Sequence, residues 1–164
     1  MSAPDWDALY AEQLPRVYNF FRYRVGDGAV AEDLASRTFE KAWVGRARFR
    51  RDLGGFGTWL LAIARNVAID HYRARRVHEP IEAADAVPSG DAPDTEHERR
   101  ETFARLGRLL EALPPGDREL VALKYGAGLP HRDIARLVGT SESNVGTRLH
   151  RTVLALRAQW TEAP

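Results

Sequence analysis

Apolar residues recur along this chain at the three- and four-residue spacing of helices, and no stretch shows the alternating pattern of a strand. In the first half the pattern predicts helices over residues 14–25, 29–43 and 58–76, with the first two split at the "GDG" of residues 26–28. In the second half it predicts helices over residues 103–113, 118–125, 131–138 and 142–160. The sequence therefore predicts an all-α fold.

The two groups of helices are separated by an acidic segment, "VHEPIEAADAVPSGDAPDTEHE", residues 77–98. It holds seven acidic residues and three prolines, with no Lys, Arg or aromatic residue. Such a composition is typical of a flexible linker. A length of 164 residues fits one domain or two. With this linker we expect two small helical domains, residues 1–76 and 99–164, joined at 77–98.

The net charge of +1 conceals a block pattern. Counting Lys and Arg against Asp and Glu gives −3 for residues 1–36, +7 for 37–76, −7 for 77–98 and +4 for 99–164. Two basic blocks on a nearly neutral chain indicate local contact with a polyanion. Ordinary solvated faces remain the alternative for either block alone.

The sequence gives no sign of a metal, cofactor or membrane-spanning site. There is no cysteine, and the five histidines lack ligand-like spacing, so we expect no metal and no cofactor. No apolar run approaches the ~18 residues of a membrane span. We therefore expect a soluble, cytoplasmic protein with no direct membrane insertion.

The segment 58–76 has two distinct faces. Its apolar stripe is formed by Leu60, Ile63, Ala64, Val67 and Ala68. Away from this stripe lie Trp59, Arg65, Asn66, Tyr72, Arg73 and Arg76. Guanidinium groups bind phosphate, aromatic rings stack on bases and an amide can read a base edge, so this face suits unpaired nucleotides. The alternative is that the aromatic rings fill the core while the arginines extend to solvent.

Residues 129–151, "LPHRDIARLVGTSESNVGTRLHR", predict two helices joined by a tight turn. Gly139 can adopt positive φ, and Ser141 is a suitable N-cap for the second helix. That helix carries an apolar stripe at Val145, Leu149, Val153, Leu156 and Trp160 and a polar face at Asn144, Thr147, Arg148 and Arg151. The arrangement favours a helix-turn-helix whose second helix enters the major groove. A generic helical hairpin is the alternative.

Together these segments resemble an extracytoplasmic-function (ECF, group IV) sigma factor, the promoter-specificity subunit of bacterial RNA polymerase. "AEDLASRTFEKAW" resembles region 2.2 of that family, and "FGTWLLAIARNVAIDHYRARR" resembles regions 2.3 and 2.4. "ALPPGDRELVALKYGAGLPHRDIARLVGTSESNVGTRLHRTVLALR" resembles regions 4.1 and 4.2. The resemblance implies a protein that binds core polymerase, recognises the −10 and −35 promoter elements and promotes promoter opening.

The resemblance also implies roles for individual residues. Asn66 stands where the family receives a flipped-out base of the −10 strand. The residues expected at the single-stranded −10 element are Trp59, Arg65, Asn66, Tyr72, Arg73, Arg75 and Arg76. Those expected at the −35 duplex are Lys124, Ser143, Asn144, Thr147, Arg148, His150 and Arg151.

Region 2.2 of the family docks on the clamp helices of the polymerase β′ subunit. The matching residues here are Asp33, Leu34, Arg37, Phe39, Ala42 and Trp43. Leu34, Phe39 and Trp43 could instead be core residues. The chain departs from the family pattern at Ser36 and Arg37, where a Gln-Glu pair is common, and at Gly146, where a basic residue is frequent. The further partners implied are the β flap, promoter DNA and an anti-sigma factor that could hold the protein at the membrane; no small-molecule substrate is expected.

Two other functions fit parts of the pattern. A stand-alone helix-turn-helix transcriptional regulator would use the first half for ligand binding or dimerisation. An enzyme acting on nucleic acid would need clustered carboxylates or a nucleophile beside a base. Glu32 and Asp33 are adjacent and so point in different directions on a helix. We therefore expect no enzymatic activity.

Overall fold

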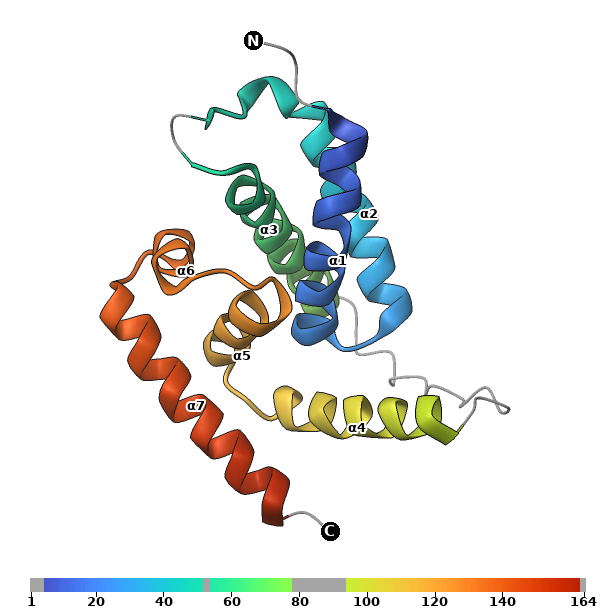
Figure 1. The fold of residues 1–164 in the computed structure, drawn as a ribbon, viewed down its shortest axis with the longest axis vertical. Coiled ribbons are helices and arrows are strands. Elements are labelled where there is room, and N and C mark those ends of the chain that lie inside the picture. Colours follow the sequence, from blue (N-terminus) through green and yellow to red (C-terminus); the bar gives the residue numbers. More distant parts are fainter. Residues whose placement is uncertain (1–4, 52–53, 78–93, 163–164) are drawn as a thin grey trace.

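The computed structural model describes residues 5–51, 54–77 and 94–162, and every regular element in these ranges is helical (Figure 1). This confirms the all-α prediction. The elements are α1 (Trp6–Val25), α2 (Gly28–Val44), a 3-10 turn η1 (Arg46–Arg48), α3 (Phe56–Val77), α4 (Asp94–Glu111), α5 (Pro115–Val121), a π-helical turn η3 (Ala122–Gly126), α6 (His131–Val138) and α7 (Glu142–Glu162).

Side-chain caps and glycines set the helix ends, and α1 begins eight residues before the predicted start at residue 14. The carboxylate of Asp5 accepts hydrogen bonds from the amides of Asp7 and Ala8 at the start of α1. Gly26, with φ of 88°, ends α1, and Asp27 then caps α2 by accepting from the Val30 amide. The predicted split at "GDG" is therefore confirmed.

Helices α1, α2 and α3 enclose the first part of the core (Figure 1). From α1, Val17, Phe20 and Phe21 are fully buried. Of the stripe predicted for α3, Leu60, Ala64, Val67 and Ala68 are buried and Ile63 is partly buried. The unbroken apolar face of α3 thus packs inward, which leaves its polar positions on the outside.

The helix-turn-helix is formed by α6 and α7 as predicted. Gly139 ends α6 in the left-handed conformation, with φ of 75°, a geometry that glycine adopts at little cost. The Ser141 hydroxyl caps α7 by accepting from the Asn144 amide at 3.1 Å. Val145 and Leu149 of α7 are buried, which turns the opposite face of α7 outward.

Helices occupy both ends of the segment predicted as linker. α3 extends to Val77, and α4 begins at Asp94, so residues 94–98 are helical. The acidic residues there, Asp94, Glu96 and Glu98, stand in the first turns of α4, where the helix dipole favours negative charge. The rest of the predicted linker, residues 78–93, lies outside the described residues.

The two halves of the chain share one continuous core. The backbones of α1 and η3 approach closely: a Cβ added at Gly126 would lie 2.8 Å from the Asn19 carbonyl oxygen. Two arginines form hydrogen bonds between the halves. Arg16 Nε donates to the Ala127 carbonyl, and Arg118 Nε donates to the Tyr23 carbonyl, both at 2.9 Å. In this conformation the halves are therefore packed against each other.

Candidate nucleic-acid and polymerase interfaces

The outer face of α3 combines exposed and engaged residues. Asn66 and the arginines at the helix end, Arg73, Arg75 and Arg76, are exposed. Tyr72 is half-buried: its hydroxyl donates to the Arg24 carbonyl at 2.7 Å, and the Arg24 guanidinium lies 4.4 Å from its ring centroid. The exposed amide and arginines are accessible to a phosphodiester strand.

Arg65, on the same helix, reaches the C-terminal half instead of solvent. Its Nε donates to Glu119 Oε1 of α5 at 3.0 Å, and its Nη1 donates to the Leu137 carbonyl at the end of α6 at 3.2 Å. Of the seven residues predicted for the −10 strand, Arg65 is therefore held by the other half of the molecule.

Trp59 belongs to an aromatic cluster at the start of α3. Its ring centroid lies 5.4 Å from that of Phe49 and 5.7 Å from that of Phe56. Phe56 is also 5.4 Å from Trp6 of α1, which is 5.5 Å from Trp43 of α2. Trp59 is half-buried in this cluster, which ties three helices together.

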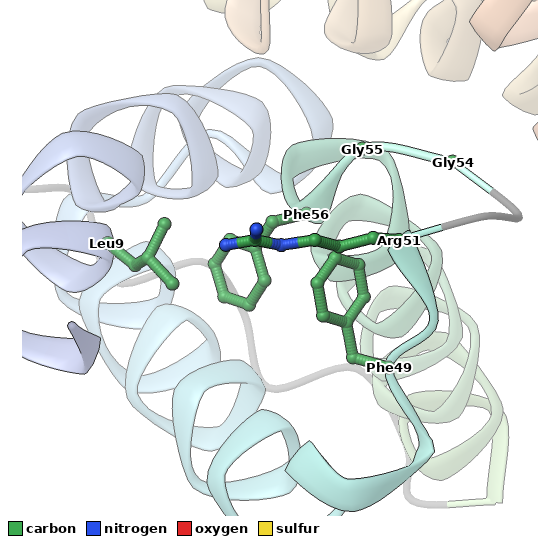
Figure 2. A pocket seen from close by; sticks show the side chains of 6 residues that line it. All are labelled: Leu9, Phe49, Arg51, Gly54, Gly55 and Phe56. Carbon is green, nitrogen blue, oxygen red and sulfur yellow. The ribbon is translucent and has the colours of Figure 1, made fainter. Parts of the chain in front are cut away.

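A cavity of about 300 Å³ opens beside this cluster (Figure 2). It is lined by Leu9, Phe49, Arg51, Gly54, Gly55 and Phe56. Figure 2 shows the Arg51 side chain crossing the Phe56 ring in this view, with its guanidinium directed toward Leu9. None of these six residues was predicted from the sequence as a site residue. The available signal was the placement of two phenylalanines around arginines and a Gly-Gly pair.

The outward face of α7 presents most of the residues predicted for duplex DNA. Ser143, Asn144, Thr147, His150 and Arg151 are all exposed. The Asn144 amide nitrogen donates to the Thr140 hydroxyl at 2.9 Å, which fixes the orientation of that side chain. This face is continuous along the helix, as insertion into a groove requires.

Two other predicted −35 residues are placed differently. Arg148 forms an ion pair with Asp117 of α5, with Nη2 2.9 Å from Oδ1. Lys124 lies in the π-helical turn and is half-buried. Neither position could be deduced from the periodicity of α7.

The surface of α2 that resembles the polymerase-docking region is only partly accessible. Asp33 and Arg37 are exposed and paired at 3.1 Å, and Trp43 is 49% exposed. Leu34 and Ala42, which we predicted as docking residues, are fully buried in the core. Their predicted direct contact with a partner does not fit these positions, because the helical period of α2 turns them toward α1 and α3.

The remaining α2 residue, Phe39, is half-buried, with its ring centroid 4.6 Å from that of Tyr10. Tyr10 of α1 and Val44 at the end of α2 are both exposed, and neither was predicted as a docking residue. Together with Trp43 they leave apolar side chains exposed on α1 and on α2, the helix that also carries the Asp33–Arg37 pair. Exposed apolar groups rimmed by charges are typical of protein-binding sites.

His71 of α3 faces the same charged neighbourhood. Burial lowers its pKa, and the nearby positive charges of Arg75 and Arg37 lower the pKa further. The side chain is therefore held in its neutral form.

Two classes of site are absent from the described parts of the chain. Residues 5–51, 54–77 and 94–162 contain no cluster of three His, Asp or Glu side chains arranged to hold a metal ion. None of the helices within these ranges has the length and apolar character needed to cross a membrane.

Both halves of the chain match models of one protein family. The family model for Sigma-70 region 2 matches residues 9–77, and that for Sigma-70 region 4 matches residues 103–156. The ECF RNA polymerase sigma factor SigL of Mycobacterium tuberculosis is 31% identical over 157 residues, which are 92% of this chain and 85% of SigL. The ECF sigma factor BldN of Streptomyces coelicolor is 31% identical over 151 residues, 90% of this chain but 57% of BldN.

A solved structure supports the same fold. The sigma factor RpoE from Bartonella quintana, in complex with the anti-sigma factor NepR, superposes with a TM-score of 0.76 and 21% identity, covering 99% of this chain and 100% of RpoE. Both sigma regions thus occur here in the order and spacing of that family. The chain belongs to the sigma-70 family of RNA polymerase sigma factors, in its ECF group.

Proposed function

We propose that this chain binds core RNA polymerase through α2 and reads a promoter through two separate surfaces, with α3 at the −10 element and α7 at the −35 element. The observation that carries the proposal is that α3 and α7, from different halves, each present an exposed polar face containing an asparagine and arginines. In this proposal residues 1–76 form the region 2 domain and residues 99–164 the region 4 domain.

On the region 2 side, the −10 element is bound as a single strand. Asn66 offers an amide to an extruded base, and Arg73, Arg75 and Arg76 follow the phosphates. The cavity beside Phe49 and Phe56 offers an aromatic wall with an adjacent guanidinium, the chemistry that favours base stacking. Holding a base out of the stack offsets the few kcal/mol roughly needed to extrude it, which couples recognition to opening.

On the region 4 side, the −35 element is bound as a duplex. The exposed face of α7 supplies Asn144, Thr147, His150 and Arg151 to the major groove. Gly146 supplies no side chain to this contact, and a Cβ there would only touch His131 at 3.6 Å. We therefore propose that base reading depends on the residues around Gly146.

Core polymerase docks on the exposed part of α2 and its neighbours. This surface consists of the Asp33–Arg37 pair, Trp43, and the adjoining Tyr10 and Val44. The β′ clamp helices are the proposed partner here, with the β flap as the partner of region 4. No step in this function requires catalysis by the chain itself.

An anti-sigma factor is the proposed regulator, with the chain acting in the cytoplasm. Its support is that the structurally similar RpoE was solved in complex with the anti-sigma factor NepR. A protein inhibitor that covers the α2 surface would compete with core polymerase.

Binding to purified bacterial core polymerase tests the proposal. The wild-type chain should co-elute with core, and Trp43→Ala should weaken that association, while Arg151→Ala on the distant α7 should not. Tight duplex binding by the chain alone, together with no association with core, would favour the stand-alone regulator.

A further inference from the structure

The short helix α5 carries two carboxylates, and each holds one arginine of a different proposed DNA-binding surface. Asp117 Oδ1 lies 2.9 Å from Arg148 Nη2 of α7. Glu119 Oε1 lies 3.0 Å from Arg65 Nε of α3. The side chains of Asp117 and Arg148 are 26% and 37% exposed, and those of Glu119 and Arg65 are 11% and 29% exposed. Both ion pairs are therefore partly shielded from solvent.

A carboxylate and a phosphate offer arginine the same kind of charged oxygen acceptor. An arginine already paired with a carboxylate must leave that partner before it can contact DNA. On the basis of the proposed function, we infer that α5 acts as an internal phosphate mimic: Asp117 withholds Arg148 from duplex DNA, and Glu119 withholds Arg65 from the single strand.

The two pairs respond differently to separation of the halves. The Glu119–Arg65 pair joins α5 to α3, and the Leu137 carbonyl, also from the C-terminal half, accepts from the same guanidinium. The Asp117–Arg148 pair lies entirely within the C-terminal half, between α5 and α7. Separating the halves therefore releases Arg65 but leaves Arg148 paired.

The residue between the two acids does not point to either DNA-binding helix. Arg118 is buried, and its Nε donates to the Tyr23 carbonyl of α1. Along α5, successive side chains at 117, 118 and 119 are therefore directed to α7, α1 and α3. This divergence explains how a helix of seven residues engages both surfaces.

The Asp117 pair is tested by fluorescence anisotropy with the full chain and a labelled mixed-sequence DNA duplex. Asp117→Asn should raise the affinity, and the gain should shrink by about 3-fold between roughly 50 and 200 mM salt, as one additional phosphate contact requires. Arg148→Ala should change binding little in the wild-type background, yet abolish the gain in the Asp117→Asn background. Glu162→Gln, which makes the same charge change at the exposed end of α7, measures the general electrostatic effect.

The Glu119 pair is tested with a labelled mixed-sequence single strand. Glu119→Gln should raise single-strand affinity without the change in duplex affinity that Asp117→Asn produces. Gly126→Ala provides a second route to the same release, because it moves η3 away from α1, weakens the packing between the halves and alters no charge. Glu12→Gln, an exposed site on α1, is the matched charge control. If Glu119→Gln unfolds, Gly126→Ala still decides the question.

The inference is overturned if the controls raise affinity as much as the α5 variants do, if the Asp117→Asn gain survives loss of Arg148, or if none of the variants binds either DNA. Transcription by core polymerase with the wild-type chain is measured separately. Gains in DNA affinity without transcription would retain the role of α5 and refute the proposed function. Transcription without those gains in affinity would refute the role of α5 and retain the proposed function.

Discussion

Gly126 provides the sharpest test of how the two halves pack. It lies in the π-helical turn η3, directly against the backbone of α1. A Cβ added there would stand 2.8 Å from the Asn19 carbonyl oxygen and 3.0 Å from the Phe20 Cα. Both obstacles are backbone atoms, so no side-chain rotation can relieve the overlap in a Gly126→Ala variant.

The size of the effect follows from these distances. Non-bonded carbon atoms prefer separations of about 3.5–4.0 Å, so η3 must move away from α1 by about 0.5–1 Å. Overpacking of this kind costs about 1–3 kcal/mol. Alanine has a higher helix propensity than glycine, and this difference stabilises the variant by up to ~1 kcal/mol. The net loss in free energy of unfolding is then up to about 2 kcal/mol, which corresponds to a Tm lower by up to about 8 °C.

Thermal unfolding followed by circular dichroism measures this loss, with Gly107→Ala as the matched control. Gly107 lies in α4 and has nothing within 4 Å of an added Cβ, so its substitution should stabilise the chain by about 0.5–1 kcal/mol.

The packing argument predicts opposite signs for the two alanine variants. Gly126→Ala should lower the Tm, while Gly107→Ala should raise it. If Gly126→Ala is stabilised as much as Gly107→Ala, the close backbone contact between η3 and α1 does not exist in solution.

Three further outcomes follow from individual side chains. Asn66→Ala should impair promoter opening, read by permanganate reactivity of the −10 strand, without reducing core binding; loss of core binding would refute its proposed role. Asp5→Ala should lower stability by about 1 kcal/mol in thermal unfolding, while Asp5→Asn retains the capping oxygen and most of the stability. Burial lowers the pKa of His71, so the unfolded chain binds the proton more readily than the folded chain. The free energy of unfolding should therefore be highest above pH ~6.5 and fall as the pH drops below that value. His71→Phe should remove this part of the pH dependence.

Local sequence signals predicted the helices and several of their ends, although α1 begins at Trp6 and α4 at Asp94, before the predicted starts at residues 14 and 103. The apolar stripe of α3, the split between α1 and α2, and the turn at Gly139 and Ser141 all depend on residues within one or two helical turns of each other. Periodicity and capping chemistry act over that range, so they can be read from one stretch of sequence.

The docking surface shows where such signals stop. An apolar residue on α2 can face a partner or the core, and the pattern that resembles region 2.2 does not separate the two. Leu34 and Ala42 face the core, whereas Trp43 remains half exposed. The exposed neighbour Tyr10 comes from α1, and only the packing of α1 against α2 brings it to the same surface.

Contacts between distant residues were beyond the sequence. Arg148 and Asp117 are 31 positions apart, and Arg65 and Glu119 are 54 apart. Each of these arginines looks free on its own helix, because the periodicity of a helix shows which way a side chain points and not what meets it. The tight approach at Gly126 is equally non-local, since it depends on the backbone of α1.

Transcription by purified bacterial core polymerase, with and without this chain, tests the central claim most directly when the 5′ ends of transcripts from genomic DNA are mapped. The account predicts a discrete set of start sites that appear only with the chain, share a −10 and a −35 motif, and are lost with Trp43→Ala. A transcript pattern identical to that of core polymerase alone would contradict the account.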